Sequence, residues 1–182
     1  MSRAKRILIA GTSGAGKSTL ARQVSGSLGL PYVEIDSLYH GPDWTPRADF
    51  EADVDAFTSQ DSWVIEWQYR RVRSLLAGRA ELLVWLDYPV PLVMWRVTGR
   101  TVRRWIGNEE LWNGNREPGL IHALTCREGI IRWAWDTRHK TAELVRELAT
   151  MQPHLQVVRL SSPAQTREWV ASLTQPVTGS VP

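Results

Sequence analysis

The chain has 182 residues, a single cysteine and a formal net charge of +3. This length suits one well-packed domain, and the lone Cys126 excludes an intrachain disulfide. No apolar run reaches the ~18 residues that span a bilayer, and the one behind the basic start is too short for a signal peptide. We therefore expect one cytoplasmic domain over residues 1–173 with no membrane partner, followed by a flexible tail over 174–182.

The first predicted elements are a strand, a glycine-rich loop and a helix. Residues 7–10 form a short apolar run, typical of a parallel strand buried on both faces. The next eight, Gly-Thr-Ser-Gly-Ala-Gly-Lys-Ser at 11–18, match the phosphate-binding loop pattern G-x-x-x-x-G-K-[ST]. Apolar residues then recur at helical spacing over 18–28. A strand before the pattern and a helix behind it make the match informative.

The loop predicts a site for a magnesium nucleotide. Glycines let successive backbone N–H groups turn around an anion at the positive end of a helix. Lys17 adds a mobile charge for the outer phosphates, and Ser18 offers its hydroxyl to Mg²⁺. The residues that we expect at the nucleotide are Gly11, Ser13, Gly14, Ala15, Gly16, Lys17, Ser18 and Thr19.

The rest of the chain alternates predicted strands with predicted helices. The strands are expected at 32–35, 63–66, 82–86 and 155–160, and the helices near 47–59, 70–78, 90–105, 127–149 and 165–173. This order predicts an α/β fold in which a five-stranded parallel sheet lies between two layers of helices.

Three carboxylates follow predicted strands. Asp36, Glu66 and Asp87 each stand at a strand's carboxyl end, where parallel sheets bind their ligands. We therefore expect them to gather near the phosphate loop. Asp36 has a second interpretation, because it could cap a helix that begins after it.

Arginines at 96, 100, 103 and 104 recur along one stripe of a predicted helix. Such a stripe could stabilise the charge that spreads over phosphate oxygens during phosphoryl transfer. It could also be an ordinary basic face. Together with a pI of 9.3, it keeps open a nucleotide-dependent protein that binds nucleic acid.

With these motifs in place, the chain resembles the nucleoside-monophosphate kinase group of P-loop kinases, which has shikimate and gluconate kinases as relatives. The likeness covers roughly residues 6–173, and its most specific parts are 64–70 and 84–100. The segments 36–46 and 109–117 look more particularly like bacterial adenylate-kinase-related or DNA topology modulation proteins. The resemblance implies the three-layer P-loop fold with an acceptor-binding segment near 37–60 and a lid near 107–125.

Carried over by position, the resemblance suggests roles for the residues behind the third strand. Glu66 stands where the family has an aspartate that helps to hold the magnesium shell. Arg70 stands where an arginine contacts the acceptor's phosphate. Trp67 replaces a glycine and Tyr69 a proline, so the wall of the acceptor pocket must differ and an AMP-like acceptor is in doubt.

The family's lid region also supplies candidate residues. The resemblance implies that Arg100 and Arg104 bind the nucleotide, and that Arg132 and Arg138 return to the transferring phosphate. His40, Trp44 and Trp67 are candidates for the acceptor pocket, although packing is the default role of a tryptophan.

Asp36 bears on the kind of acceptor. An aspartate at this position resembles the shikimate-kinase arrangement, in which a carboxylate orients or deprotonates the acceptor's hydroxyl group. A nucleotide-like acceptor is already anionic and needs positive charge instead.

These observations predict a phosphotransferase that moves the terminal phosphate of Mg-ATP to a small molecule carrying a hydroxyl or a nucleotide-like group. The predicted catalytic residues are Lys17, Asp36, Arg100, Arg132 and Arg138. A nucleic-acid-binding regulator is the alternative, and it is not favoured because a phosphate-handling enzyme also needs basic charge. The sequence leaves open the acceptor, the choice between ATP and GTP, and the oligomeric state.

Overall fold

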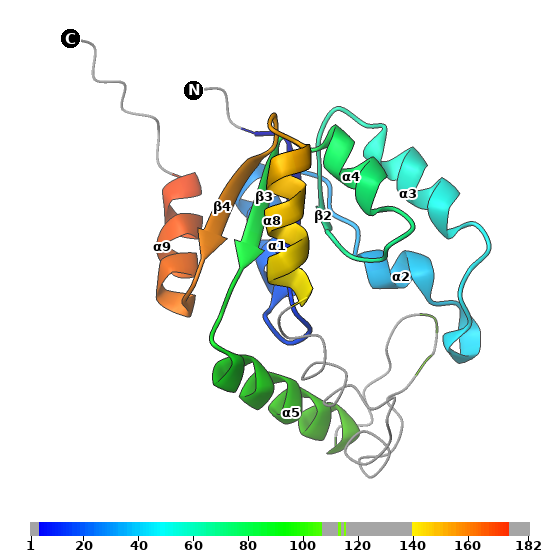
Figure 1. The fold of residues 1–182 in the computed structure, drawn as a ribbon. Helices are drawn as coiled ribbons and strands as arrows, with labels where there is room; N and C mark the ends of the chain where they lie inside the picture. The colour runs from blue at the N-terminus through cyan, green and yellow to red at the C-terminus, as the bar shows by residue number, and fades with distance from the viewer. Residues whose placement is uncertain (1–3, 107–112, 114, 116–139, 175–182) are drawn as a thin grey trace.

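The computed structural model describes residues 4–106, 113, 115 and 140–174, and they form a parallel sheet between two layers of helices (Figure 1). The strands are β1 (Arg6–Gly11), β2 (Trp63–Glu66), β3 (Leu82–Leu86) and β4 (Gln156–Leu160). The helices are α1 (Lys17–Leu28), α2 (Ile35–Tyr39), the 3₁₀ turn η1 (Pro42–Trp44), α3 (Phe50–Thr58), α4 (Arg73–Arg79), α5 (Val90–Ile106), α8 (Lys140–Met151) and α9 (Pro163–Leu173).

The sheet has the order β2-β1-β3-β4, with every neighbouring pair parallel. In register, Ile7 of β1 lies beside Val64 of β2 and Leu82 of β3. All residues of β2 and β3 are buried, as expected of strands that helices cover on both sides. The strand ranges predicted at 63–66 and 82–86 are confirmed.

Alternate residues of each strand feed two separate apolar cores. Leu8 and Leu83 face the core under α2, α3, α4 and α8, which also holds the fully buried Trp63. Ile9 and Val84 face the other core, under α1 and α9. The sheet is therefore fixed from both sides, and the loops at its carboxyl edge start from a rigid platform.

The prediction of a fifth strand at 32–35 is wrong for the described part of the chain, where the sheet has four strands. Tyr32 makes only an isolated parallel bridge to Val64, and the chain then turns into α2 at Ile35. The turn is held by the backbone N–H of Ile35, which donates to the Glu66 carboxylate at 3.0 Å. Asp36 therefore lies in the first turn of a helix and does not end a strand.

The predicted helices mostly match the observed ones. The range 90–105 corresponds to α5, and 47–59 contains α3, which starts three residues later at Phe50. The range 127–149 overlaps α8 from Lys140 onward, and its earlier part lies outside the described residues. The C-terminal helix begins at Pro163 because Ser162 caps it, accepting a hydrogen bond from the Gln165 backbone N–H.

Candidate active site

The phosphate loop connects β1 to α1 at the carboxyl edge of the sheet. Gly14 and Gly16 have φ angles of 83° and 101°, in the left-handed region that glycine tolerates best. The turn between them is closed by the Ala15 N–H, which donates to the Thr12 carbonyl at 3.1 Å. α1 starts at Lys17, so its unpaired backbone N–H groups open onto this loop. The backbone therefore has the form of an anion-binding loop at a helix N-terminus.

Helix α5 lies across the end of the sheet next to this loop (Figure 1). A Cβ at Gly14 would overlap the side chain of Val97 and lie 3.1 Å from the Val93 carbonyl oxygen. The Arg96 guanidinium donates to the Ala15 carbonyl at 3.2 Å and lies 5.2 Å above the Tyr88 ring. The loop is thus packed against α5 as well as α1.

The ammonium group of Lys17 interacts electrostatically with several charged side chains. Burial lowers the pKa of its ammonium group, the carboxylates of Asp36 and Glu66 raise it, and the positive charge of Arg100 lowers it again. Its Nζ atom lies 3.4 Å from the Thr12 carbonyl oxygen. The structure therefore brings Asp36, Glu66 and Arg100 within electrostatic reach of Lys17, as expected for a site that handles phosphate charge.

Glu66 is a buried carboxylate with specific hydrogen bonds. Its Oε1 atom accepts from the Tyr32 hydroxyl at 2.7 Å, and its Oε2 atom accepts from the Ile35 N–H. Burial raises the pKa of Glu66, while the bonds from Ile35, Tyr32 and the Ser18 hydroxyl oppose that shift. Glu66 beside Ser18 offers the hard oxygen donors that suit Mg²⁺. Among the described residues, no cluster of three or more His, Cys, Asp or Glu side chains could hold a metal ion.

Asp36 faces the loop from α2, and two donors fix its side chain. The Gln68 amide and the Tyr69 hydroxyl both donate to Oδ1, at 2.7 and 2.6 Å. Within the described part of the chain, no hydrogen bond to Oδ2 is observed. The carboxylate is thus anchored by one oxygen, and the other remains for a ligand.

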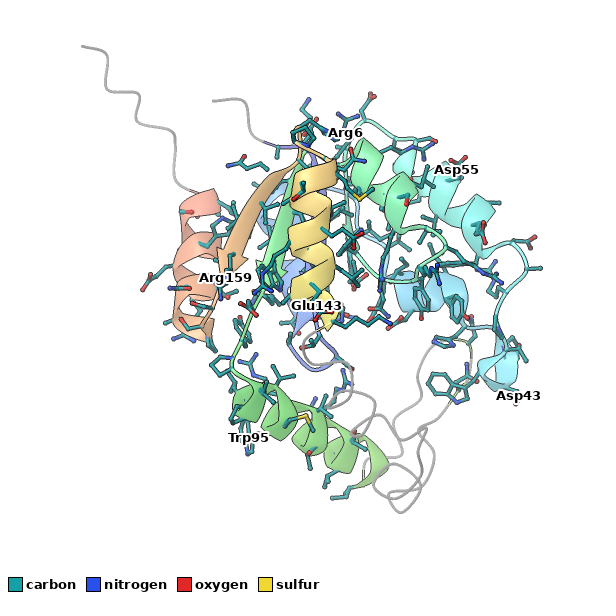
Figure 2. The ribbon with its side chains drawn as sticks, viewed as in Figure 1. Arg6, Asp43, Asp55, Trp95, Glu143 and Arg159 are labelled. Atoms are coloured by element: carbon teal, nitrogen blue, oxygen red, sulfur yellow. The ribbon has the colours of Figure 1, made fainter. Side chains whose placement is uncertain are left out.

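Asp87 follows Leu86, which lies beside Gly11 in the sheet, and its carboxylate has a partner on the neighbouring strand. Its Oδ2 atom accepts a hydrogen bond from the Nε atom of Arg159 on β4 at 2.7 Å. The Arg159 guanidinium also lies 5.3 Å above the Trp85 ring, and Figure 2 places Arg159 beside the sheet. Asp36 and Glu66 therefore lie within electrostatic reach of Lys17, whereas the Asp87 carboxylate is paired with Arg159.

A cluster of aromatic side chains contacts Asp36 through Tyr69. The rings of Tyr39 and Tyr69 are stacked, with centroids 4.1 Å apart, and the His40 ring meets the Trp44 ring edge-on at 5.1 Å. The His40 Nε2 atom lies 3.2 Å from the Tyr69 hydroxyl oxygen. The predicted acceptor residues are therefore connected to Asp36 through Tyr69, His40 directly and Trp44 through His40, and their binding role stays a prediction.

Trp67 and Arg70 lie in different surroundings. Trp67 is buried in the core, its indole N–H donates to the Arg73 carbonyl at 3.2 Å, and the Arg73 guanidinium lies 5.4 Å above its ring. Arg70 is exposed at the start of the same turn. Burial and the positive charge of Arg70 both lower the pKa of Arg73, so two like charges stand close together here.

Two asparagines hold the loop behind His40. Asn115 is buried, accepts a hydrogen bond from the Trp44 N–H at 2.9 Å and donates to the Gly41 carbonyl at 2.8 Å. The Asn113 amide donates to the His40 carbonyl. Residues more than 70 positions apart in the sequence are thus joined beside the candidate acceptor site.

Several predicted site residues fall outside the described part of the chain. These are Arg132, Arg138 and most of the lid range 107–125. Arg104 belongs to α5, but its side chain is not described. Their roles stay predictions.

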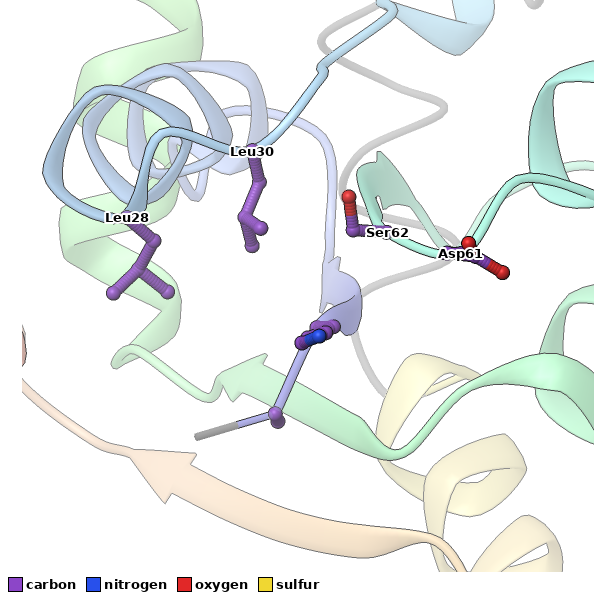
Figure 3. Close-up of a pocket in the computed structure, with 6 residues that line it drawn as sticks. Leu28, Leu30, Asp61 and Ser62 are labelled. Atoms are coloured by element: carbon purple, nitrogen blue, oxygen red, sulfur yellow. The ribbon is translucent and has the colours of Figure 1, made fainter. Parts of the chain in front are cut away.

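A pocket of about 240 Å³ lies at the end of the sheet opposite the phosphate loop (Figure 3). It is lined by Ala4, Lys5, Leu28, Leu30, Asp61 and Ser62. Lys5 precedes β1 and Ser62 precedes β2, so the pocket is at the amino edge of the sheet. Ligands of parallel sheets bind at the carboxyl edge, and this pocket is not the candidate active site.

Sequence comparison gives a short match. No protein-family model matches the chain. A 44-residue segment is 48% identical to part of the bifunctional pantoate ligase/cytidylate kinase of Synechococcus sp. (strain RCC307), covering 24% of this chain and 9% of that protein. The chain therefore matches only a small fraction of that relative's length.

The structure is similar to solved kinases over nearly its whole length. The shikimate kinase of Acinetobacter baumannii, solved with shikimate, has a TM-score of 0.55 at 17% identity, with 93% of this chain and 90% of that chain covered. The shikimate kinase of Bacteroides thetaiotaomicron has a TM-score of 0.52 at 15% identity, with coverages of 94% and 96%. A gluconokinase from Sinorhizobium meliloti 1021 has a TM-score of 0.50 at 18% identity, with coverages of 93% and 91%. The chain thus has the fold of P-loop kinases.

In the described residues, no helix is long and apolar enough to cross a membrane.

Sequence reasoning missed the hydrogen bonds that Gln68 and Tyr69 make to Asp36. The sequence carries no signal for these contacts, because Asp36 lies more than 30 positions earlier in the chain.

Proposed function

We propose that this protein is a kinase that transfers the terminal phosphate of Mg-ATP to a hydroxyl group of a small molecule. The observation that carries the proposal is that the Asp36 carboxylate lies within electrostatic reach of Lys17 in the phosphate loop, with only one oxygen anchored. A base beside a bound polyphosphate is what a hydroxyl acceptor needs.

On the nucleotide side, the proposal assigns the phosphates to the backbone N–H groups of the loop and to Lys17. Arg100 adds a second charge near the same point, which supports its predicted role at the transferring phosphate. Ser18 and Glu66 would hold Mg²⁺, which neutralises charge on the phosphate oxygens when bound. Arg104, Arg132 and Arg138 are proposed to complete this side.

On the acceptor side, Asp36 Oδ2 is proposed to take the hydroxyl proton. The acceptor oxygen then bonds to the terminal phosphorus while the bond from that phosphorus to ADP breaks. Lys17 offsets the charge that develops on the transferring group. Such a step requires Asp36 to be held in one orientation, and the bonds from Gln68 and Tyr69 favour this.

An anionic group on the acceptor is a further part of the proposal. Arg70 and Arg73 stand close together, and neither has a carboxylate partner among the described residues. By contrast, Arg47 pairs with Asp53 at 2.8 Å. Adjacent like charges are unfavourable until an anion binds between them. The named substrates of two similar kinases, gluconate and shikimate, are hydroxy acids, which agrees with this assignment.

The nucleic-acid alternative loses support from the placement of the arginine stripe. Arg96 contacts the phosphate loop, and Arg100 lies near Lys17. Of the three stripe arginines whose side chains are described, Arg103 alone is exposed. Were DNA bound through this helix, the affinity would fall steeply as salt rises and weaken in Arg103→Gln.

A screen for acceptor-dependent ADP formation tests the proposal. Hydroxy acids, sugars, nucleosides and nucleoside monophosphates are offered to the full chain with Mg-ATP, and Lys17→Ala serves as the blank. We expect turnover with a hydroxyl acceptor, and its fall to a small residual rate in Asp36→Asn. Full activity of Asp36→Asn would favour a nucleotide-like acceptor, and no stimulation by any compound would contradict the kinase proposal.

A further inference from the structure

Tyr69 links Asp36 to His40 through a hydrogen-bonded chain. Its hydroxyl lies 2.6 Å from Asp36 Oδ1 and 3.2 Å from His40 Nε2. An ionised carboxylate can only accept, so the Tyr69 hydroxyl donates its one proton to Asp36. The phenol oxygen then accepts from His40, which places a proton on Nε2 of the imidazole. The direction of the whole chain is therefore fixed.

The position of Tyr69 is enforced by its surroundings. Its backbone has a φ angle of 55°, which is uncommon for a residue other than glycine. The ring is stacked on Tyr39 at an interplanar angle of 23° and meets Phe50 edge-on at 5.2 Å. Left-handed residues of this kind persist where the surrounding structure over-determines them, and they cluster at functional sites. Burial, reinforced by the charge of Asp36, also raises the pKa of Tyr69, so that the hydroxyl remains a donor.

We propose that Tyr69, backed by His40, is a positioning residue that holds Asp36 with Oδ2 turned toward the acceptor's hydroxyl group. The proposal rests on the proposed kinase function. Tyr69 keeps its proton throughout the reaction, because it already donates to Oδ1 and the acceptor's proton goes to Oδ2. Its contribution is the orientation of the carboxylate, and fixed orientation of a reacting group is worth a large rate factor.

The competing interpretation is that Tyr69 only packs. Its ring joins α2 to the loop before α4, and that role needs the ring but not the hydroxyl. Tyr39 offers a matched comparison, because it stacks on the same ring and its hydroxyl makes no hydrogen bond within the described part of the chain. Removing one hydroxyl from each tyrosine therefore separates positioning from packing.

The first experiment compares Tyr69→Phe with Tyr39→Phe in the acceptor-dependent assay. We expect Tyr69→Phe to lower kcat by about 10- to 100-fold, the usual cost of losing a partner that orients a reactive ligand. Its KM for ATP should not change, and Tyr39→Phe should keep the wild-type kcat. Equal kcat values for both variants and the wild type would overturn the proposal.

A double-mutant cycle with Asp36→Asn gives a readout that packing would not move. If Tyr69 acts through Asp36, Tyr69→Phe lowers kcat by a far smaller factor in the Asp36→Asn background than in the wild type. If Tyr69 only packs, the two losses multiply, and that result would also overturn the proposal.

His40 supplies the third readout. His40→Gln can still donate an amide N–H to the Tyr69 oxygen, whereas His40→Leu cannot. We expect a higher kcat for His40→Gln than for His40→Leu, and this difference should vanish in Tyr69→Phe. A difference that persists without the Tyr69 hydroxyl would contradict the chain. If no acceptor stimulates the wild-type protein, the proposed function itself is contradicted. If the wild type is stimulated but the variants behave otherwise than expected, only the Tyr69 assignment fails.

Discussion

The phosphate loop is shaped by its own backbone, whereas the acceptor side is assembled by side chains from three separate segments. In the loop, Gly14 and Gly16 provide the turns and α1 begins at once. Beside Asp36, the contacts come from residues more than 30 positions away, Gln68 and Tyr69, and the loop behind His40 is held by Asn115. A local motif thus serves one half of the site, and long-range hydrogen bonds serve the other.

This difference suggests how the two halves can change. Backbone geometry accepts few substitutions, because any side chain at a left-handed glycine is strained. A set of side-chain contacts can be replaced one residue at a time while the sheet stays intact. We infer that the loop fixes which chemistry is possible and that the surroundings of Asp36 determine which acceptor is used. Variants in each half test this division.

The largest effect is expected for Lys17→Ala. Loss of a charge aimed at the transferring phosphate should reduce turnover by about 1,000-fold or more, because such charges act in a site screened from water. Lys140→Ala is the matched control, since Lys140 is exposed at the start of α8. ADP formation under saturating ATP measures both. Retained turnover in Lys17→Ala would show that the loop does not serve the reaction.

The next effect is expected for Gly14→Ala. The added Cβ would overlap Val97 at a φ angle of 83°, so we expect a loss of about 1–3 kcal/mol in unfolding free energy and weaker ATP binding. Gly26→Ala is the control, because Gly26 lies in α1 with nothing within 4 Å of its added Cβ. That change should stabilise the protein by about 0.5–1 kcal/mol. Urea unfolding and nucleotide titration give both quantities, and equal responses would contradict a backbone-determined loop.

Asn115→Ala tests the acceptor half. It leaves the Trp44 N–H and the Gly41 carbonyl without their side-chain partner, a loss of about 1–3 kcal/mol for groups removed from water. We expect a higher KM for the acceptor and an unchanged dissociation constant for ATP. Asn115→Asp keeps an oxygen for Trp44 but loses the donor to Gly41. Its KM for the acceptor should therefore lie between those of the wild type and Asn115→Ala. An equal loss of ATP affinity would mean that the two halves are not separable.

The smallest effect is expected at the amino edge of the sheet, which neither half uses. Burial would raise the pKa of Glu81, but the hydrogen bonds that it accepts from the backbone of Lys5 and from Arg6 outweigh burial and hold that pKa below its ordinary value. The carboxylate therefore stabilises the fold above its ordinary pKa, and this contribution is lost as the pH falls through the lowered value. The side chains of Arg6 and Glu81 are both about 40% exposed. Glu81→Gln should therefore lower the free energy of unfolding by at most about 1 kcal/mol at neutral pH.

The measurement is urea unfolding of Glu81→Gln across the acidic range. Glu168→Gln is the control, because Glu168 is exposed on α9. The difference in unfolding free energy between the wild type and Glu81→Gln should shrink toward low pH. Turnover should be normal in both variants. An activity loss in Glu81→Gln would extend the site beyond the carboxyl edge of the sheet.

The parts that the sequence predicts well are those with local causes. The strands at 63–66 and 82–86 follow from unbroken apolar runs, and the loop at 11–18 follows from its glycines. The expected strand at 32–35 fails because the Ile35 N–H binds Glu66, which is 31 residues away. Apolar spacing carries no information about such a contact.

The environment of Asp36 escapes prediction for the same reason. The position of Tyr69 looks like a replaced proline when the sequence is compared with related kinases. Only the folded chain brings its hydroxyl to Asp36, which is 33 residues earlier. Asn113 and Asn115 look like turn residues, yet their amides bind the backbone of a loop more than 70 residues away.

The early turn of the chain into α2 also bears on self-association. An extended segment along β2 would present an open row of N–H and C=O groups, to which a strand of another molecule could add. Here the strand pairing with β2 stops at the single bridge of Tyr32, and α2 begins three residues later at Ile35. On the opposite border, β4 is only five residues long and bears the charged Arg159. Short, charged or interrupted borders discourage intermolecular sheet growth, so the same turn that presents Asp36 to the site also helps to guard against aggregation.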